Sequence, residues 1–489
     1  MMFSAHRWAA LALFSLLSLN QLDTAGASTA EGAVQHHADH ARRHHADHQL
    51  REQAEERSRI AAMPVANKLK IQRFIKNVEG RYSKPAVQED KWEPEPAKVH
   101  GLDTTVADSD NKVQGDIIRQ LAGAIKTGMD HIGEGFAKLG SNRGTKMIKR
   151  QNVGAVVAIP LRDVVLAEDQ DAEYLAQVMV GTPPVPYWLQ ADSGSVNGQR
   201  KLYSMANSST YQPTPSKKSF ELYYSQGGVR GVMVRENLAF GADLFGNGGI
   251  KIQSQTLGLA RELSADFATD STDGVLGLGF RALTAAGERT ILQNLFAQNI
   301  VKSKIVSFYL GRKRSATQDR SEMRIGDTNQ ALFQGDIHYV PVTKKAYWSF
   351  NFGRFTVSGA SKKKGVAGGK DGLEGVVDTG TSYIALPFGS ATDFWSAVPG
   401  AQSVGAYNYW VYPCSNKLAV EFSLPDGTVF KLDPADLNAG KAYTGSTNCI
   451  GTVFSADTGN RAIFGASLLK SVYTVLDWGS NQIGFAQAV

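Results

Sequence analysis

The sequence contains Tyr187-Trp188-Leu189-Gln190-Ala191-Asp192-Ser193-Gly194-Ser195, a strand-like run that ends in aspartate, a hydroxyl residue, glycine and a second hydroxyl residue. The same arrangement returns at Gly375-Val376-Val377-Asp378-Thr379-Gly380-Thr381. A third Asp-Thr-Gly, at residues 457–459, is followed by asparagine rather than a hydroxyl residue and has the composition of a turn. We therefore interpret the third copy as a loop and the first two copies as a functional pair.

Each of the first two copies has a companion further along the chain. Val275-Leu276-Gly277 follows the first copy, and Ile463-Phe464-Gly465 follows the second. The separation from aspartate to companion glycine is 85 residues in the first half and 87 residues in the second. Matched motifs at matched spacing indicate an internally duplicated chain with one aspartate in each half.

Two carboxyl groups that are brought together do not both ionise easily, and such a pair titrates with split pKa values. The ionised carboxylate accepts a proton from water, and the protonated one polarises a carbonyl and later donates its proton. The pattern therefore predicts Asp192 and Asp378 as the catalytic residues of water attack on an amide. The following hydroxyls are expected to hold the two loops, and the glycines to let backbone amides approach the carboxylates. These supporting residues are Ser193, Gly194, Ser195, Thr379, Gly380 and Thr381.

The composition limits the classes of protein to consider. With 489 residues, 42% hydrophobic and 20% charged, the chain is long enough for two or three folded units and is not wholly disordered. Two cysteines exclude a disulfide-rich miniprotein and a cysteine-rich metal site. The net charge of +6 divides into +4 over residues 1–150 and +2 over the remainder, so no basic surface for nucleic acid is indicated.

The first 150 residues differ from the rest. Residues 1–27 have the pattern of a secretory signal peptide: a positive start, a short apolar run and a small-residue cleavage site. Residues 28–150 carry a histidine-rich tract at 36–48 and an apolar stripe over 113–139 that predicts a helix. The histidine tract is interpreted as a solvated segment, with metal binding and pH sensing as alternatives. Lys149-Arg150 ends this region as a candidate processing site.

After residue 150 the chain reads as β structure, with short alternating runs, glycine-rich turns and helices only near 290–299, 391–397 and 434–437. Over residues 174–489 it resembles the pepsin-like aspartic endopeptidases. Residues 174–184 are similar to the family's first strand and turn, and residues 224–231 to its flap hairpin. Residues 273–279, 340–348 and 463–486 are similar to its inner strand, its lobe connection and its closing strands.

The resemblance implies a mainly all-β, bilobal fold with pseudo-twofold lobes, residues 151–340 and 341–489, and a central substrate cleft. It implies that Tyr224, Gln226 and Gly227 belong to a flap over the substrate and that Cys414 and Cys449 form a disulfide. It implies a secreted acid endopeptidase. Residues 28–150 show no clear motif of the family, and their position before the dibasic pair predicts the pro-segment and inhibitor of a zymogen. The expected partners are protein or peptide substrates. We expect a monomer without metal, cofactor, nucleic acid or membrane span, in an extracellular or vacuolar location.

Some positions depart from the family pattern. The first motif is Asp-Ser-Gly, residues 196–199 lack the usual tryptophan that supports the flap, and Ala466 stands where an aspartate is common. Two other functions are alternatives to an active enzyme. One is a catalytically silent binding or inhibitor protein of the same fold, which usually loses an aspartate or a motif hydroxyl. The other is a metal-binding secreted protein that uses the histidine tract.

Overall fold

The structure of the protein is a computed structural model. It describes residues 74–75, 78–79, 81–82, 154–166, 170–193, 203–214, 219–224, 227–241, 248–263, 272–284, 287–313, 320–358, 363–369, 371–405 and 408–489. The signal peptide, the histidine tract, the predicted helix over 113–139 and Lys149-Arg150 lie outside these residues. The described residues form 26 strands with a few short helices, so the expected mainly all-β fold is confirmed.

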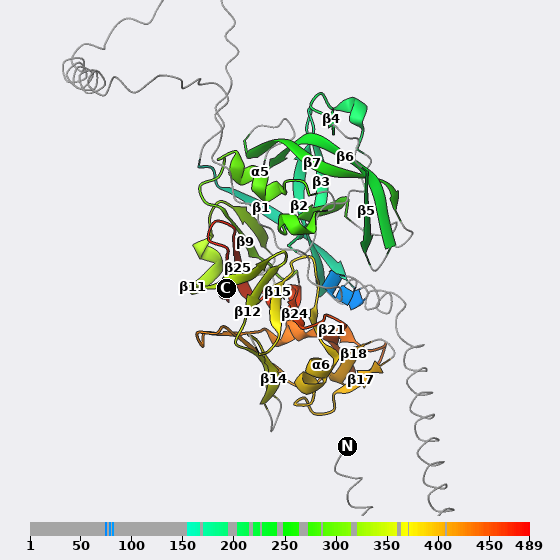
Figure 1. The fold of residues 1–489 in the computed structure, drawn as a ribbon. Coiled ribbons are helices and arrows are strands. Elements are labelled where there is room, and N and C mark those ends of the chain that lie inside the picture. Colours follow the sequence, from blue (N-terminus) through cyan, green and yellow to red (C-terminus); the bar gives the residue numbers. More distant parts are fainter. Residues whose placement is uncertain are drawn as a thin grey trace, which may run out of the picture.

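The N-terminal lobe, cyan to green in Figure 1, is built from the first ten strands. They are β1 (Val157–Leu166), β2 (Gln170–Val180), β3 (Val185–Asp192), β4 (Gln212–Pro213), β5 (Ser219–Tyr224), β6 (Gly227–Phe240), β7 (Ile250–Leu263), β8 (Gly274–Gly277), β9 (Ile305–Tyr309) and β10 (Ser321–Ile325). The helical segments are η2 (Met205–Asn207), η4 (Arg281–Leu283), α5 (Ile291–Ala297) and η5 (Gln330–Leu332). Helix α5 begins after Thr290, whose side chain forms a capping box with Gln293.

The C-terminal lobe, yellow to orange in Figure 1, contains most of the remaining strands. They are β12 (Trp348–Asn351), β13 (Arg354–Ser358), β14 (Lys363–Ala367), β15 (Glu374–Val377), β16 (Ile384–Leu386), β17 (Gln402–Val404), β18 (Tyr409–Pro413), β19 (Ala419–Ser423), β20 (Val429–Lys431), β21 (Asn438–Lys441), β22 (Asn448–Gly451), β23 (Val453–Ser455) and β24 (Arg461–Phe464). The helical segments are α6 (Phe388–Trp395), η7 (Pro434–Leu437) and α7 (Ala466–Leu469).

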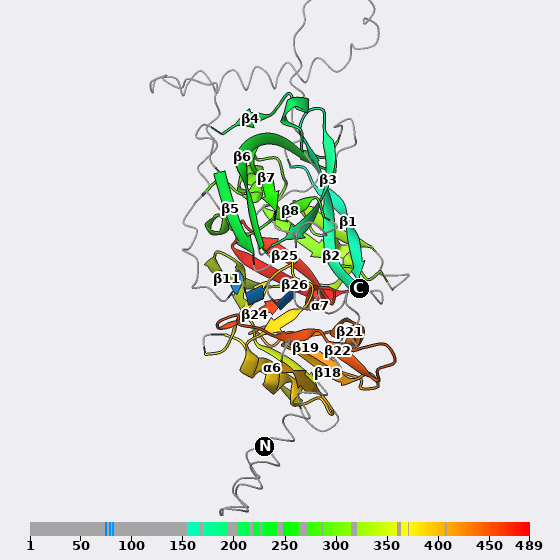
Figure 2. The same cartoon turned by 90° about the vertical axis from the view of Figure 1, so that its right-hand side faces the viewer.

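A layer of six strands joins the two lobes. Its order is β1–β10–β9–β25–β26–β11, in which β11 is Phe333–Lys345, β25 is Val472–Asp477 and β26 is Gln482–Ala488. The end of the chain therefore pairs with β9 of the N-terminal lobe, and Figure 2 shows β25 and β26 between the lobes. The division that the sequence places between residues 340 and 341 falls inside β11.

The two lobes repeat one three-strand unit. In the N-terminal lobe, β3 pairs antiparallel with β2 and parallel with β8. In the C-terminal lobe, β15 pairs antiparallel with β12 and parallel with β24. Strands β8 and β24 contain the companion segments of the two motifs, which gives the matched spacing in the sequence its structural basis. Asp192 ends β3 and Asp378 directly follows β15, so both aspartates leave equivalent strand ends.

The core runs through both lobes without a break. Aromatic side chains dominate it in the C-terminal lobe, where Phe350 packs against Phe422, Phe464 and Phe485 at centroid distances of 6.1, 6.2 and 5.2 Å. All four rings are fully buried, and such pairs stabilise a core beyond the area that they bury. This aromatic core supports β15 and β24 from below and thereby fixes the position of Asp378. Among the described residues, no helix is long and apolar enough to cross a membrane.

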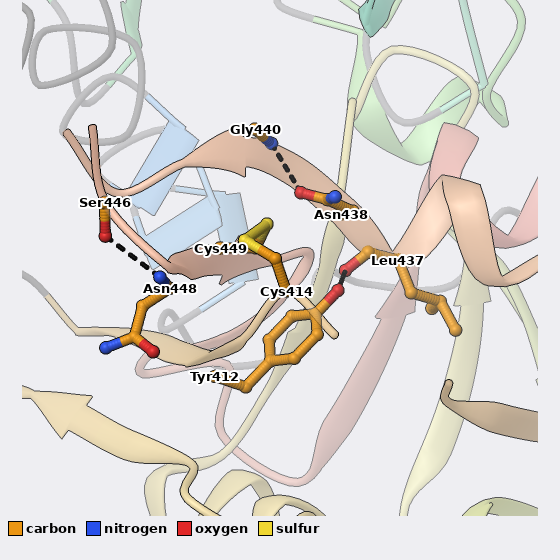
Figure 3. The surroundings of a disulfide bond; sticks show 8 residues. All are labelled: Tyr412, Cys414, Leu437, Asn438, Gly440, Ser446, Asn448 and Cys449. Atoms are coloured by element: carbon orange, nitrogen blue, oxygen red, sulfur yellow. Dashed lines mark hydrogen bonds between the residues drawn. A yellow bond between two sulfur atoms is a disulfide. The ribbon is translucent and has the colours of Figure 1, made fainter. Parts of the chain in front are cut away.

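The disulfide that the family resemblance implied is present between Cys414 and Cys449. Cys449 lies on β22, and Cys414 directly follows β18, the strand that pairs with β22. Figure 3 shows the surroundings of the bond, in which the Tyr412 hydroxyl donates to the Leu437 carbonyl at 3.5 Å. The bond ties two neighbouring strands of the sheet β17–β18–β22–β21 at the outer part of the C-terminal lobe.

Candidate active site

The loops that carry the two aspartates are joined by a reciprocal set of hydrogen bonds. The Ser193 hydroxyl donates to the Val377 carbonyl at 3.0 Å and accepts from the Thr379 backbone N–H at 3.0 Å. The Thr379 hydroxyl donates to the Ala191 carbonyl at 2.7 Å and accepts from the Ser193 backbone N–H at 3.0 Å. Each hydroxyl is thus used as donor and acceptor across the lobe boundary, which fixes the two strand ends relative to each other.

Further contacts hold the Asp378 carboxylate in one orientation. The Gly380 backbone N–H donates to Oδ1 at 3.0 Å, and the Thr381 hydroxyl donates to Oδ2 at 2.5 Å. Gly380 also lies directly against the other aspartate, since a Cβ atom at this position would be 2.2 Å from Cγ of Asp192. Only glycine fits there, and its backbone therefore lies close to both carboxylates.

The electrostatic surroundings of Asp378 favour proton uptake. Burial raises the pKa of Asp378, and the negative charge of Asp192 raises it further. Arg81 and hydrogen bonds from Thr381 and Tyr82 act in the opposite direction, but the net result is a pKa above the usual value. Both carboxyl groups are completely buried. Such a pair holds one proton more readily than two isolated aspartates do.

A short helical segment from the front of the chain lies between the lobes, blue in Figures 1 and 2. We call it the inter-lobe helix; its described residues are Phe74, Ile75, Val78, Glu79, Arg81 and Tyr82. Its apolar residues stand at helical spacing and are buried against the C-terminal lobe. The Phe74 ring lies 5.1 Å from Tyr383 and 4.8 Å from Phe454, centroid to centroid. This packing places the end of the segment at the aspartates.

Arg81 binds both aspartates. Its Nη2 lies 2.9 Å from Oδ2 of Asp192, and its Nη1 lies 3.2 Å from Oδ2 of Asp378. The arginine side chain is 10% exposed and the two carboxylates are fully buried. One guanidinium group therefore bridges the pair, which means that both carboxylates face the same small volume.

Tyr82 adds a neutral contact to this ion-pair group. Its hydroxyl donates to Oδ2 of Asp378 at 2.7 Å. Burial, with the nearby charge of Asp378, raises the pKa of Tyr82 well above its usual value, so that the phenol keeps its proton. Together, Arg81 and Tyr82 occupy the acceptor positions that the two carboxylates would otherwise offer to water or to a substrate.

The predicted flap residues and the third Asp-Thr-Gly lie on segments other than the two aspartate loops or outside the described residues. Tyr224 is the last residue of β5 and Gly227 the first of β6, and the two are paired at the end of this hairpin. Gly194, Ser195 and Gln226 lie outside the described residues. The third Asp-Thr-Gly lies in the loop between β23 and β24, where the Asp457 backbone N–H donates to Glu79 at 3.4 Å.

Arg81 and Tyr82 were not predicted from the sequence. A signal was available, because Phe74, Ile75, Val78 and Tyr82 stand at positions i, i+1, i+4 and i+8 of a helix. The longer apolar stripe over 113–139 is the stronger helix signal in this region and predicts the helix there. As for metal binding, the described part of the chain contains no group of three or more potential ligands close enough to hold an ion.

This geometry agrees with what comparison with known proteins shows. The family model described as eukaryotic aspartyl protease matches residues 173–488, which is well over half of the chain. The chain therefore belongs to the eukaryotic aspartyl protease family, as the pepsin-like resemblance implied, and is a hydrolase of the aspartic endopeptidase type.

Individual relatives are similar over most of their length. Gastricsin of Cavia porcellus is 30% identical over 340 residues, which cover 65% of this chain and 81% of the relative. Cathepsin D of Homo sapiens is 28% identical over 365 residues, 69% of this chain and 86% of the relative. Major aspartyl peptidase 1 of Cryptococcus neoformans var. grubii is 27% identical over 405 residues, 76% of this chain and 80% of the relative.

Proposed function

We propose that the protein is the zymogen of a secreted acid endopeptidase, which hydrolyses peptide bonds in proteins through Asp192 and Asp378. The observation that carries the proposal is the contact of one guanidinium, that of Arg81, with both carboxylates. Two carboxylates within reach of one small group are also within reach of one water molecule and one scissile amide. The names of the pepsins and cathepsins among its relatives support the same chemistry.

In the proposed reaction the pair begins with one proton. The ionised carboxylate takes a proton from water as the water oxygen forms a bond to the amide carbon, and the protonated carboxyl donates its proton to the amide oxygen. The tetrahedral diol then collapses: one hydroxyl gives its proton to the carboxylate that is now ionised, the amide nitrogen takes the proton that the other carboxyl accepted from water, and the C–N bond breaks as the C=O bond forms. The raised pKa of Asp378 supports this residue as a holder of the shared proton.

The surrounding residues have proposed roles as positioning groups. The exchange of hydrogen bonds between Ser193 and Thr379 keeps the two loops at a fixed separation. Gly380 and Thr381 orient the Asp378 carboxylate by their donated hydrogen bonds. Gly194 and Ser195 have the same proposed roles in the N-terminal lobe.

The β5–β6 hairpin with Tyr224, Gln226 and Gly227 is the proposed flap over the bound peptide.

We further propose that the inter-lobe helix keeps the precursor inactive. Arg81 and Tyr82 occupy the acceptors that the reaction needs, and the apolar face of the helix holds them there. As the pH falls, Asp378 takes up a proton because its pKa is raised, and its attraction to Arg81 weakens. Release is followed by removal of residues 28–150 after Lys149-Arg150. The mature enzyme would then consist of lobes 151–340 and 341–489 and act as a monomer outside the cell or in a vacuole.

The proposal is tested with the full-length chain, a quenched fluorescent peptide library and a pepstatin-type transition-state analogue. We expect cleavage at pH 3–5, inhibition by the analogue, and no cleavage by the variants Asp192→Asn and Asp378→Asn. N-terminal sequencing of the active product should give a start near Gln151. Turnover in either aspartate variant, or cleavage at pH 8 but not at pH 4, would show that the proposed mechanism is wrong.

A further inference from the structure

Two side chains outside the aspartate pair bind the backbone of the inter-lobe helix. Nη1 of Arg461 donates to the Tyr82 carbonyl at 2.9 Å, and the Tyr347 hydroxyl donates to the Arg81 carbonyl at 2.9 Å. These are main-chain acceptors, so the contacts do not depend on the side chains of the helix. When the helix leaves, both donors can bind acceptors of a substrate instead.

Arg461 is held in position by its own lobe. Its Nε lies 3.4 Å from Oε2 of Glu374, and the Thr343 hydroxyl donates to the other oxygen of Glu374 at 2.5 Å. The guanidinium carbon lies 6.0 Å from the centre of the Tyr347 ring, over its face. Arg461 is 13% exposed and Glu374 29% exposed. Glu374 thus engages one edge of the guanidinium and leaves Nη1 directed at the inter-lobe helix.

Tyr82 of the inter-lobe helix contacts both Asp378 and Arg461. The Tyr82 side chain ends at Oδ2 of Asp378, and its backbone carbonyl ends at Nη1 of Arg461. When the helix leaves, the Arg461 guanidinium remains on the surface of the C-terminal lobe that the helix covers.

We propose that Arg461, oriented by Glu374 and flanked by Tyr347, forms a substrate subsite in the surface that the inter-lobe helix covers, and that this subsite takes an aspartate or glutamate side chain of the bound peptide. This inference rests on the proposed endopeptidase function. Arginine stays charged at every relevant pH and binds carboxylates through charge-assisted hydrogen bonds that are stronger than those to a neutral carbonyl. A peptide carbonyl accepts from the Tyr347 hydroxyl, as the Arg81 carbonyl does in the precursor.

The subsite has a characteristic pH dependence. Substrate aspartate and glutamate ionise at about pH 3.9 and 4.3, so preference for them over asparagine and glutamine should grow from pH 3 to pH 5. Glu374 is the titratable group that pairs with Arg461, and the Tyr347 ring and the Tyr82 carbonyl also contact its guanidinium. The charges of Arg81 and Asp378 also act on Tyr347. If Arg461 only stabilised the fold, the preference for acidic residues over asparagine and glutamine would not change between pH 3 and pH 5.

The test uses the full-length protein after incubation at pH 4 and a peptide library that varies each position around the cleaved bond. We compare wild type, Arg461→Gln and Arg461→Lys. The matched control is Arg324→Gln, since Arg324 on β10 also pairs through Nε with a glutamate, Glu322, at 2.9 Å. Wild type and the control should favour an acidic residue at one position. Arg461→Gln should lose about tenfold or more in kcat/KM for acidic peptides at pH 5, with little change for neutral ones.

The outcomes separate this inference from the function on which it rests. Cleavage of neutral peptides by Arg461→Gln shows that the variant is folded and active. Arg461→Lys should keep part of the acidic preference because it keeps the charge. If wild type cleaves peptides without acidic preference, or if Arg461→Gln keeps that preference, the subsite is wrong and the endopeptidase proposal stands. If wild type cleaves no peptide at any pH, both proposals fail.

Discussion

Nη2 of Arg81 lies 2.9 Å from Oδ2 of Asp192, although 111 residues separate the two along the chain. The same guanidinium reaches Asp378 in the other lobe. A single residue of the front region thus compensates the charge of two buried carboxylates that belong to different halves of a duplicated fold. Because all three groups are largely buried, the contact is much less screened by salt than a surface ion pair would be.

The first prediction concerns this arginine. Removing one partner of a buried ion pair costs about 3–5 kcal/mol, because the other charges stay buried without compensation. The variant Arg81→Ala should therefore release the inter-lobe helix at a higher pH than wild type. If the inter-lobe helix keeps the chain inactive, as proposed, the full-length variant should cleave a fluorogenic peptide already at pH 6, where the full-length wild type is silent. Gel analysis of the same samples shows whether the chain is still intact.

Arg81→Lys serves as the graded control for that measurement. Lysine keeps the charge but lacks the fork that reaches both carboxylates, so its precursor should become active at an intermediate pH. An Arg81→Ala precursor that stays as inactive as wild type at pH 6 would mean that the arginine does not keep the site closed.

The second prediction concerns Gly380. An added Cβ would lie 2.2 Å from Cγ and 2.5 Å from both carboxylate oxygens of Asp192, so either the loop or the carboxylate must move. A displacement of about 1 Å at reacting groups costs up to about a hundredfold in rate. We expect Gly380→Ala to lose at least this much in kcat and to unfold at a lower temperature.

Gly389 provides the matched control for the glycine substitution. It lies in α6, and an added Cβ there would meet no atom within 4 Å. Alanine is the better helix former by about 1 kcal/mol, so Gly389→Ala should keep full activity and melt at the same or a higher temperature. Equal activity of both alanine variants would contradict the close approach of Gly380 to Asp192.

The sequence predicted the parts of the site that depend on local pattern and repetition. Asp192 and Asp378 are predicted as the catalytic pair because each follows an apolar strand and because the two motifs recur with their companions, and the structure brings both carboxylates to one guanidinium. Helix α5 was expected at 290–299 and is present at Ile291–Ala297, since Thr290 provides a clear start signal. Helix α6 begins three residues before the expected position, because Pro387 rather than a polar cap precedes it.

The place of the inter-lobe helix in the fold could not be predicted from the sequence. Its apolar face has ordinary helical spacing, and such a face predicts burial without stating the surface on which it packs. That surface is assembled from segments that lie about 300 to 390 residues further on, among them Tyr383 and Phe454. The role of Arg81 depends on this tertiary contact, and a lone arginine in a basic region carries no signal of it.

The third prediction concerns the disulfide between Cys414 and Cys449. The bond closes a loop with a sequence separation of 35 residues, and the chain-entropy model assigns about 3–4 kcal/mol of stability to a loop of that size. The double variant Cys414→Ala/Cys449→Ala should unfold at a clearly lower denaturant concentration than wild type. Reduction should lower the wild-type midpoint toward that of the variant and leave the variant itself unchanged. Identical midpoints without reductant would contradict a stabilising role.

The last prediction concerns Glu236, which is completely buried on β6. Its carboxylate accepts hydrogen bonds from the Tyr203 hydroxyl, from the Thr210 hydroxyl at 2.5 Å and from the Asn237 backbone N–H at 2.7 Å. Burial alone would raise the pKa of Glu236, but these hydrogen bonds outweigh it and lower the pKa below the usual value. The charged form is therefore more stable in the folded protein than in the unfolded chain.

The direction of the pH dependence follows from that shift. A lowered pKa contributes stability that is fully present above the usual glutamate pKa and is lost as the pH falls through the lowered value. Glu236→Gln should cost about 1–3 kcal/mol of folding stability at pH 7. The amide nitrogen of glutamine replaces one of the two carboxylate oxygens and cannot accept the hydrogen bond from the hydroxyl that faces it, that of Tyr203 or Thr210. The cost should shrink at pH 3, where the wild-type carboxyl begins to take up a proton. Thermal unfolding of both proteins at the two pH values measures this difference. Asp393→Asn, at an exposed position on α6, is the control and should leave the unfolding temperature unchanged. A Glu236→Gln cost that is equal at pH 3 and pH 7 would show that the network stabilises the fold without the charge.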